Sequence, residues 1–118
     1  MKRIGMLAAA ACALLGAQAA TAQQDPDRVG GLVELSGTGA TSGTNFDNGV
    51  KLAVKEINAA GGILGRKIEY TSGDTQSNPQ IAKALAQKAV DEGAYVVMGP
   101  VFSGSIMVSM AETKRAEI

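Results

Sequence analysis

Short apolar stretches alternate three times with amphipathic segments along this chain, and few folds accommodate that order. Residues 28–35 and 94–98 are mostly apolar and residues 67–71 alternate in the manner of a strand, and each stretch precedes a segment with helical periodicity. Strands that alternate with helices form a parallel sheet with right-handed crossovers. The sequence therefore predicts an α/β fold, an open parallel sheet sandwiched by helices, with strand order 2-1-3.

Three amphipathic helices are predicted to follow these strands. Thr44 and Asp47 have the spacing of a capping box at the start of the first helix, after a loop at residues 36–45. Asn78 followed by Pro79 starts the second helix, because proline is favoured at the first helical position. The residues expected to face inward are Phe46, Val50, Ala53, Val54 and Ile57 in the first helix, Ile81, Leu85, Ala89 and Val90 in the second, and Ile106, Met107, Met110 and Ala111 in a third helix at residues 103–117.

The third apolar stretch indicates whether the predicted sheet is complete. Residues 94–98 form a continuous apolar run, which is typical of a strand covered on both faces. With strand order 2-1-3 this strand would lie at an open edge, and native sheets avoid exposed apolar edges. We therefore expect the chain to be the front part of a longer protein.

Composition excludes several functions. The chain has no histidine, so it cannot supply a Ser-His-Asp or Cys-His nucleophile system or a His-ligated metal site. Eleven basic residues balance eleven acidic ones, and aromatic residues make up 3%, which argues against a nucleic-acid binder. The chain also lacks the Gly-x-Ser-x-Gly elbow of α/β hydrolases and a P-loop. We expect a protein that is not an enzyme and that uses no metal or cofactor.

The amino-terminal segment has the pattern of a secretory signal peptide. Lys2 and Arg3 give a positive start, residues 4–18 are nearly all apolar or small, and residues 20–22 (Ala-Thr-Ala) fit the small-x-small cleavage rule. The apolar stretch is shorter than the roughly 20 residues of a membrane span. We predict export to the periplasm with cleavage after Ala22.

Cys12, the single cysteine, lies inside this apolar stretch and allows a second interpretation, a lipoprotein. The residues before it lack the leucine usual three places upstream, so ordinary cleavage is favoured. Cleavage after Ala22 would remove Cys12 and leave an exported chain with no disulfide partner. We divide the chain into a signal peptide at residues 1–22, a linker at 23–27 and a folded part at 28–118.

A binding site is predicted where the winding of the sheet reverses. Ligands of such sheets bind beyond the carboxyl ends of the strands at this point, here between the first and third strands. Residues 36–45 and 99–105 would flank it, and both are rich in small hydroxyl residues. Ser103-Gly104-Ser105 starts the third helix, where unbonded N–H groups and the helix dipole favour an anion. Ser103 as a plain N-cap accounts for the same residues equally well.

Two other motifs have a weaker functional interpretation. Gly37-x-Gly39-x-x-x-Gly43 approximates a dinucleotide fingerprint, but it has one residue too many and lacks the acidic residue expected about 20 positions later. A flexible binding loop is the favoured interpretation. Asp74, just after the second strand, is the type of residue that accepts a phosphoryl group or binds a metal. It has no acidic partners nearby, which favours a solvated turn.

Several stretches resemble the leucine/isoleucine/valine-binding type of periplasmic substrate-binding protein. The most specific is EINAAGGI-x-GRKIE at residues 56–69, and residues 48–55, 74–79 and 99–104 also match. The resemblance runs from about Val29 to the end. It implies that residues 28–118 are the first part of one lobe of a two-lobed protein, which closes on an amino acid or a related small molecule and delivers it to an inner-membrane ABC permease.

The resemblance also implies roles for particular residues. In that family the serine after the Gly-Pro turn of the third strand holds the ligand carboxylate, and Ser103 occupies this position. Ser36 and Gly37 would line the mouth of the cleft. Ser42 stands where leucine-binding members can carry an aromatic residue against the ligand, which puts a bulky aliphatic ligand in doubt.

Two further points limit what the resemblance implies. Some members join the second loop to the third by a disulfide, at places that are Ser77 and Phe102 here. The same lobe also occurs in ligand-sensing ectodomains of receptors, which is the alternative to a transport function. A transmembrane segment and a signalling domain would distinguish the receptor from the transporter.

Overall fold

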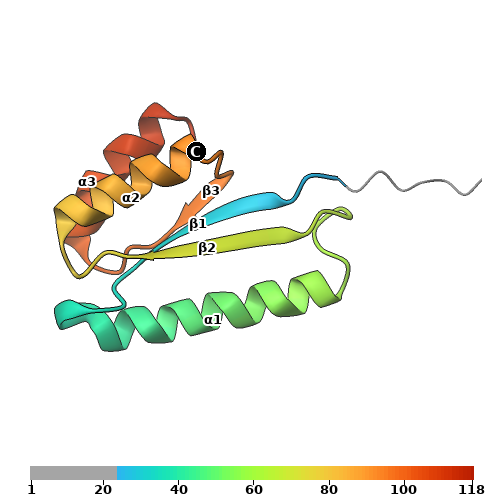
Figure 1. Ribbon diagram of the computed structural model, residues 1–118, viewed down its shortest axis with the longest axis horizontal. Coiled ribbons are helices and arrows are strands. Elements are labelled where there is room, and N and C mark those ends of the chain that lie inside the picture. The colour runs from blue at the N-terminus through green and yellow to red at the C-terminus, as the bar shows by residue number, and fades with distance from the viewer. Residues whose placement is uncertain (1–23) are drawn as a thin grey trace, which may run out of the picture.

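The computed structural model describes residues 24–118, so the predicted signal peptide, its cleavage site after Ala22 and Cys12 lie outside the described residues. Three parallel strands form one sheet in the order β2-β1-β3, as predicted. In Figure 1, α1 covers one face of this sheet, and α2 and α3 cover the other. The elements in chain order are β1 (Asp27–Val33), the 3-10 turn η1 (Gly37–Gly39), α1 (Ala40–Ala59), β2 (Ile68–Asp74), α2 (Pro79–Asp91), β3 (Val96–Met98) and α3 (Ser103–Arg115).

The central strand β1 forms the middle of the core. Leu32 and Val33 are buried almost completely, and successive residues of a strand point to opposite faces of a sheet. Gly30 of β1 lies directly under α2, since a Cβ atom there would come within 2.8 Å of the Ala89 Cβ. β1 begins at Asp27, one residue inside the predicted linker, and ends at Val33, two residues earlier than expected.

The second helix begins as predicted. The side chain of Asn78 accepts a hydrogen bond from the Gln80 N–H at 2.8 Å, and Pro79 is the first helical residue. A capping side chain of this kind satisfies one of the unbonded N–H groups of a helix start. The buried residues of α2 are Ala82, Ala86 and Ala89, and their small side chains allow α3 to pack closely against it.

The start of α1 differs from the prediction. The helix begins at Ala40, inside the segment expected to be a loop, and its cap is Gly39. Asp47 is therefore not a capping residue. It is buried, accepts a hydrogen bond from the Tyr70 hydroxyl at 3.0 Å and pairs with Lys51 at 2.5 Å. Packing against the end of β1 stabilises this first turn, although its Ser, Thr and Gly residues are weak helix formers.

The inward face of α3 also differs from the prediction. Met107 and Met110, expected in the core, are 74% and 60% exposed, whereas Ser105, Ser109 and Glu112 are buried. Serines on the buried face suit close packing against the alanines of α2. The buried Glu112 carboxylate forms ion pairs with Arg115 and with Lys83, the latter at 3.7 Å.

The third strand is shorter and more exposed than its sequence indicates. β3 includes only Val96–Met98, and it pairs with β1 on one side. Val96 and Met98 are 40% and 37% exposed, so within the described residues β3 is not covered on both faces. The uncovered face is the one toward α1, where Met98 joins the apolar side of that helix in lining an open groove.

Candidate functional site

The two segments predicted to flank a ligand lie at one edge of the sheet. β1 and β3 are parallel neighbours, paired from Val29 with Val96 to Gly31 with Met98, so their carboxyl ends lie side by side. Residues 36–39 follow the first strand and residues 99–102 follow the third. This is the point at which the sheet reverses its winding, and open α/β sheets bind ligands there.

Glu34, which sequence reasoning did not select, joins these two segments. Its side chain is 0% exposed. The Val101 N–H donates to Glu34 Oε2 at 3.0 Å, and the Phe102 N–H donates to Oε1 at 3.3 Å. We call these two hydrogen bonds the Glu34 bridge. The one signal in the sequence is a charged residue between Val33 and Leu35, at the end of an otherwise apolar stretch.

Two glycines make room for this buried carboxylate. A Cβ atom on Gly39 would lie 2.9 Å from the Glu34 Cβ and 2.8 Å from the Phe102 ring. A Cβ atom on Gly43 would overlap the backbone carbonyl of Glu34. The glycine spacing that approximates a dinucleotide fingerprint therefore has a packing explanation, because it lets the start of α1 lie against the end of β1.

The first turn of α3 faces this junction with unbonded amides. Phe102 is the N-cap, with extended backbone angles (φ −85°, ψ 130°) and no side-chain cap, so Ser103 is the first helical residue and not the cap. The N–H groups of Ser103, Gly104 and Ser105 have no partners inside the helix, as at any helix start. Together with the positive end of the helix dipole, they favour an anion.

The two serines of this turn differ in exposure. Ser103 is exposed, and no hydrogen bond among the described residues uses its hydroxyl. Ser105 is 1% exposed and lies on the buried face of α3, where its Oγ has no hydrogen-bond partner within residues 24–118. A hydroxyl buried in this way is not accessible from solvent, whereas the Ser103 hydroxyl is.

Asp74 organises the loop after β1. It accepts hydrogen bonds from the Ser36 hydroxyl at 2.6 Å, from the Leu35 and Ser36 N–H groups at 2.9 and 3.1 Å, and from the Gln76 N–H at 2.8 Å. The bond from the Ser36 hydroxyl is the largest cause that lowers the pKa of the Asp74 carboxyl; burial, the second largest, opposes it, and the backbone bonds lower the pKa further, so the pKa lies below its ordinary value. Asp74 is thus neither free nor in a plain solvated turn, and the Ser36 hydroxyl is already engaged.

Ser77 makes a second connection between the same loops. Its hydroxyl donates to the Ser36 carbonyl at 2.8 Å and accepts from the Gly39 N–H at 2.9 Å. Gly37 lies between these contacts with φ of +77°, a conformation that favours glycine. Ser42 lies exposed in the first turn of α1. The structure therefore fixes the backbone of the loop around Ser36 and Gly37 and leaves Ser42 open to solvent.

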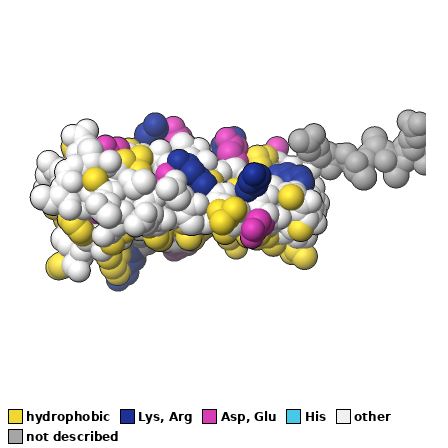
Figure 2. Space-filling view, turned by 90° about the horizontal axis from the view of Figure 1, so that it is seen from below, with side chains coloured by type: hydrophobic (Ala, Val, Ile, Leu, Met, Phe, Trp, Pro, Cys, Tyr) yellow, Lys and Arg dark blue, Asp and Glu magenta, His cyan; other side chains and the backbone are white. Residues whose placement is uncertain are grey.

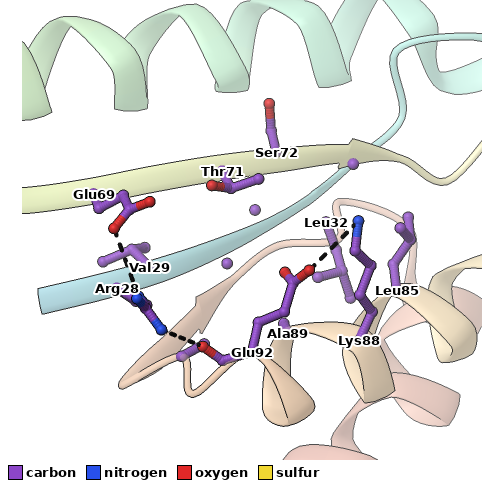
Figure 3. Close-up of a pocket in the computed structure, with 14 residues that line it drawn as sticks. Arg28, Val29, Leu32, Glu69, Thr71, Ser72, Leu85, Lys88, Ala89 and Glu92 are labelled. Carbon is purple, nitrogen blue, oxygen red and sulfur yellow. Dashed lines mark hydrogen bonds and ion pairs between the residues drawn. The ribbon is translucent and has the colours of Figure 1, made fainter.

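A separate cavity lies between β1, β2 and α2 (Figure 3). Its charged side chains contact one another: Arg28 Nη1 donates to the Glu92 carbonyl at 3.0 Å, Arg28 Nε lies 3.6 Å from the Glu69 carboxylate, and Lys88 Nζ lies 3.7 Å from the Glu92 carboxylate. Its lining includes no residue of the segments 34–39 and 99–105. This cavity is therefore distinct from the junction at the carboxyl ends.

Other kinds of site receive no support from the described part of the chain. Residues 24–118 contain no group of three or more acidic, cysteine or histidine side chains placed to hold a metal ion. Among the same residues, no helix combines the length and apolar character needed to cross a membrane.

A family model described as periplasmic binding protein matches residues 26–117. The chain belongs to this family. The match confirms the resemblance found in the sequence, and it identifies the class of the protein as substrate-binding. The three-stranded sheet and its helices are part of the fold that the family shares.

Individual members of the family are also similar to this chain. The Leu/Ile/Val-binding protein BraC3 of Rhizobium johnstonii is 40% identical over 76 residues, which are 64% of this chain and 21% of that protein. The chemotactic signal transduction system substrate-binding protein BasB of Halobacterium salinarum is 37% identical over 94 residues, 77% of this chain and 22% of that protein.

A solved structure agrees with these matches. The branched-chain amino acid transporter substrate-binding protein LivJ of Streptococcus pneumoniae, in complex with isoleucine, is 35% identical to this chain with a TM-score of 0.77. The match covers 79% of this chain and 27% of LivJ. The chain thus spans about a fifth to a quarter of the length of these relatives.

Proposed function

We propose that this chain belongs to an extracytoplasmic solute-binding protein that takes up an amino acid, or a related small amide or carboxylate, for an inner-membrane ABC permease. Membership of the periplasmic binding protein family is the observation that carries the proposal. The names of the similar proteins, which specify leucine, isoleucine and valine, support a branched-chain amino acid as ligand. Residues 28–118 would form the first part of the amino-terminal lobe, with the ligand between two lobes.

The start of α3 would hold the carboxylate of the ligand. The exposed Ser103 hydroxyl donates one hydrogen bond, and Gly104 and Ser105 contribute their backbone N–H groups. The helix dipole adds a favourable interaction of about 0.3–1 kcal/mol with a negative group. Ser36, Gly37 and Ser42 would line the mouth of the same cleft, the first two through a backbone that Asp74 and Ser77 already fix.

We also propose that the chain is exported to the periplasm. The positively charged start, the apolar segment and the small-x-small motif that ends at Ala22 support cleavage after that residue. Lipidation at Cys12 is the less favoured alternative. The charge balance of the chain gives no support to nucleic acid as a partner.

Sensing is the second candidate function. The relative from Halobacterium salinarum is named as a substrate-binding protein of a chemotactic signal transduction system, and this name supports a signalling partner as the alternative. Both functions require the same binding step. They differ in the partner, which is a permease in one case and a transducer or receptor in the other.

A ligand screen on the protein encoded by the whole reading frame tests the shared binding step. The twenty amino acids, their amides and small carboxylates are added one at a time, and the melting temperature is measured. At 100 times its Kd a ligand would stabilise the protein by about 2.7 kcal/mol, a shift of several degrees. We expect branched-chain amino acids to give the largest shifts. No shift with any of these compounds would refute the proposed class of ligand.

A further inference from the structure

We propose that Glu34 is a positioning residue for ligand binding, which fixes the direction of the first turn of α3 relative to the end of β1. This inference rests on the proposed function, since it concerns how the same site is held. It begins from the Glu34 bridge, in which both carboxylate oxygens accept backbone N–H groups from the two residues before the helix.

The place of these two amides in the chain gives the bridge its effect. Val101 and Phe102 immediately precede Ser103, and Phe102 is the N-cap of α3. Because a peptide unit is planar, fixing two consecutive N–H groups fixes the orientation of the backbone that enters the helix. The N–H groups and the hydroxyl that would meet the ligand carboxylate belong to the next three residues. Their direction therefore depends on the position of the Glu34 side chain.

The burial of Glu34 makes this dependence strong. A carboxylate that is 0% exposed has lost its water, so the two backbone N–H groups are what compensate it among the described residues. Gly39 and Gly43 pack against Glu34 from η1 and α1. One side chain thus connects the loop after β1 with the turn after β3, which are the two segments that would contact the ligand.

Glu34 also has an effect that opposes ligand binding. A negative charge near the start of α3 repels a carboxylate and by itself weakens binding. A variant that keeps the negative charge but has a shorter side chain distinguishes the two effects. Positioning predicts weaker binding by such a variant, and repulsion alone predicts no loss. Glu34→Asp is such a variant, because aspartate is one methylene shorter and cannot reach both amides from the same backbone position.

The experiment compares Glu34→Asp and Glu34→Gln by isothermal titration calorimetry, using the protein of the whole reading frame. The probe is L-isoleucine, or the amino acid that stabilises the wild type most if another one does. We expect both variants to bind roughly tenfold more weakly, the loss that corresponds to one buried hydrogen bond. Glu69→Gln is the matched control, because Glu69 is exposed and pairs with Arg28 away from the junction. Its Kd should equal that of the wild type.

A double-mutant cycle with Ser103→Ala distinguishes positioning from a general loss of stability. If Glu34 acts through the start of α3, Glu34→Asp should weaken binding by a smaller factor once Ser103 is already alanine, because one of the donors that Glu34 positions is then absent. Independent, additive effects would overturn the proposal. So would an unchanged Kd for Glu34→Asp, or tighter binding by Glu34→Gln alone, which would indicate repulsion.

A second variant keeps the test decisive if the Glu34 variants do not fold. Gly39→Ala retains both carboxylate oxygens and displaces them, because the new Cβ would lie within 3 Å of Glu34 and Phe102. It should weaken binding of the same probe, whereas Gly49→Ala, which has no atom within 4 Å of the new Cβ, should not. Equal affinities for these two variants overturn the inference. A wild type that binds no ligand overturns the proposed function itself.

Discussion

Three polar side chains near the carboxyl ends of the strands hold the backbone of the loops. Glu34 accepts two turn amides, Asp74 accepts the Ser36 hydroxyl, and Ser77 connects Ser36 with Gly39. Ser103 differs from them, because its hydroxyl is exposed and makes no hydrogen bond within the described residues. At the scale of single residues, the candidate site is a fixed frame in which the Ser103 and Ser42 hydroxyls, each in the first turn of a helix, are exposed.

The first prediction concerns this hydroxyl. Ser103→Ala should weaken binding of an amino acid by about 1–3 kcal/mol, because one oxygen of the ligand carboxylate would lose its donor. The measurement is calorimetric titration of the protein of the whole reading frame. Thr113→Ala is a suitable control, since the Thr113 hydroxyl bonds the Met110 carbonyl at the far end of α3. Unchanged affinity of the Ser103 variant would remove this side chain from the ligand contacts.

The second prediction concerns Asp74 and pH. Its pKa in the folded state is lower than the ordinary value of 3.8, so the carboxylate stabilises the folded state above that pH and loses its effect as the pH falls through the folded-state pKa. Asp74→Asn should lower the free energy of unfolding by about 1–2 kcal/mol at pH 7, since Asp74 is partly exposed. Urea denaturation should show this difference at pH 7 and a smaller one near pH 3. A difference that does not depend on pH would contradict it.

At the scale of elements, the start of α1 shows what decides a helix boundary in this chain. Residues 40–45 have weak helical propensity, and the helix nevertheless extends through them because Gly43 lets it lie on the Glu34 backbone. Tertiary contact outweighs propensity here. The same contact connects α1 to the frame of the candidate site.

The third prediction tests this contact. Gly43→Ala should destabilise the protein by about 1–3 kcal/mol, since its Cβ would overlap the Glu34 carbonyl and α1 would have to move. Gly49→Ala, in the same helix with open space around its Cβ, should instead stabilise by about 0.5–1 kcal/mol. Chemical denaturation of both variants measures the difference. Equal shifts of the unfolding midpoint in the two variants would show that the close contact between Gly43 and the Glu34 backbone does not determine the effect of the substitution.

The elements differ in how well their sequences predicted them. The order of strands and helices and the cap of α2 followed from periodicity and from Asn78-Pro79, which are local signals. The start of α1 and the buried face of α3 depended on partners distant in sequence, namely Glu34 and the alanines of α2. For the same reason the sequence predicted which two segments follow the neighbouring strands β1 and β3, and did not predict the Glu34 bridge between them, because both partners of Glu34 are more than 60 residues away.

At the scale of the whole molecule, the two sides of α1 differ. Figure 2 views the molecule from the α1 side, where basic and acidic side chains are scattered over the surface and hydrophobic ones gather along one rim. An open apolar groove lies between α1 and the sheet, where Phe46, Val50, Val54 and Ile57 adjoin Met98. Residues 24–118 therefore expose apolar surface in one continuous strip next to the free edge of β3.

The fourth prediction follows from this groove. Residues 24–118 produced alone should bind the dye ANS and associate at high concentration, because continuous exposed apolar surface favours both. Ala53→Glu places a charge in the groove and should reduce both effects, whereas Lys55→Glu, on an exposed position outside it, should not. Dye fluorescence and sedimentation velocity measure the outcome. Equal behaviour of the two variants would assign the association to another surface.

The contacts of Ser77 have a practical consequence for the molecule. A hydroxyl with two hydrogen bonds joins the loops after β1 and β2, where a covalent cross-link would be the other way to connect them. A hydroxyl has no redox chemistry under cellular conditions, so dithiothreitol or the glutathione of a bacterial cytosol should leave this connection intact. Residues 24–118 contain no cysteine, so a reducing compartment should leave the frame around Ser36 and Gly39 unchanged.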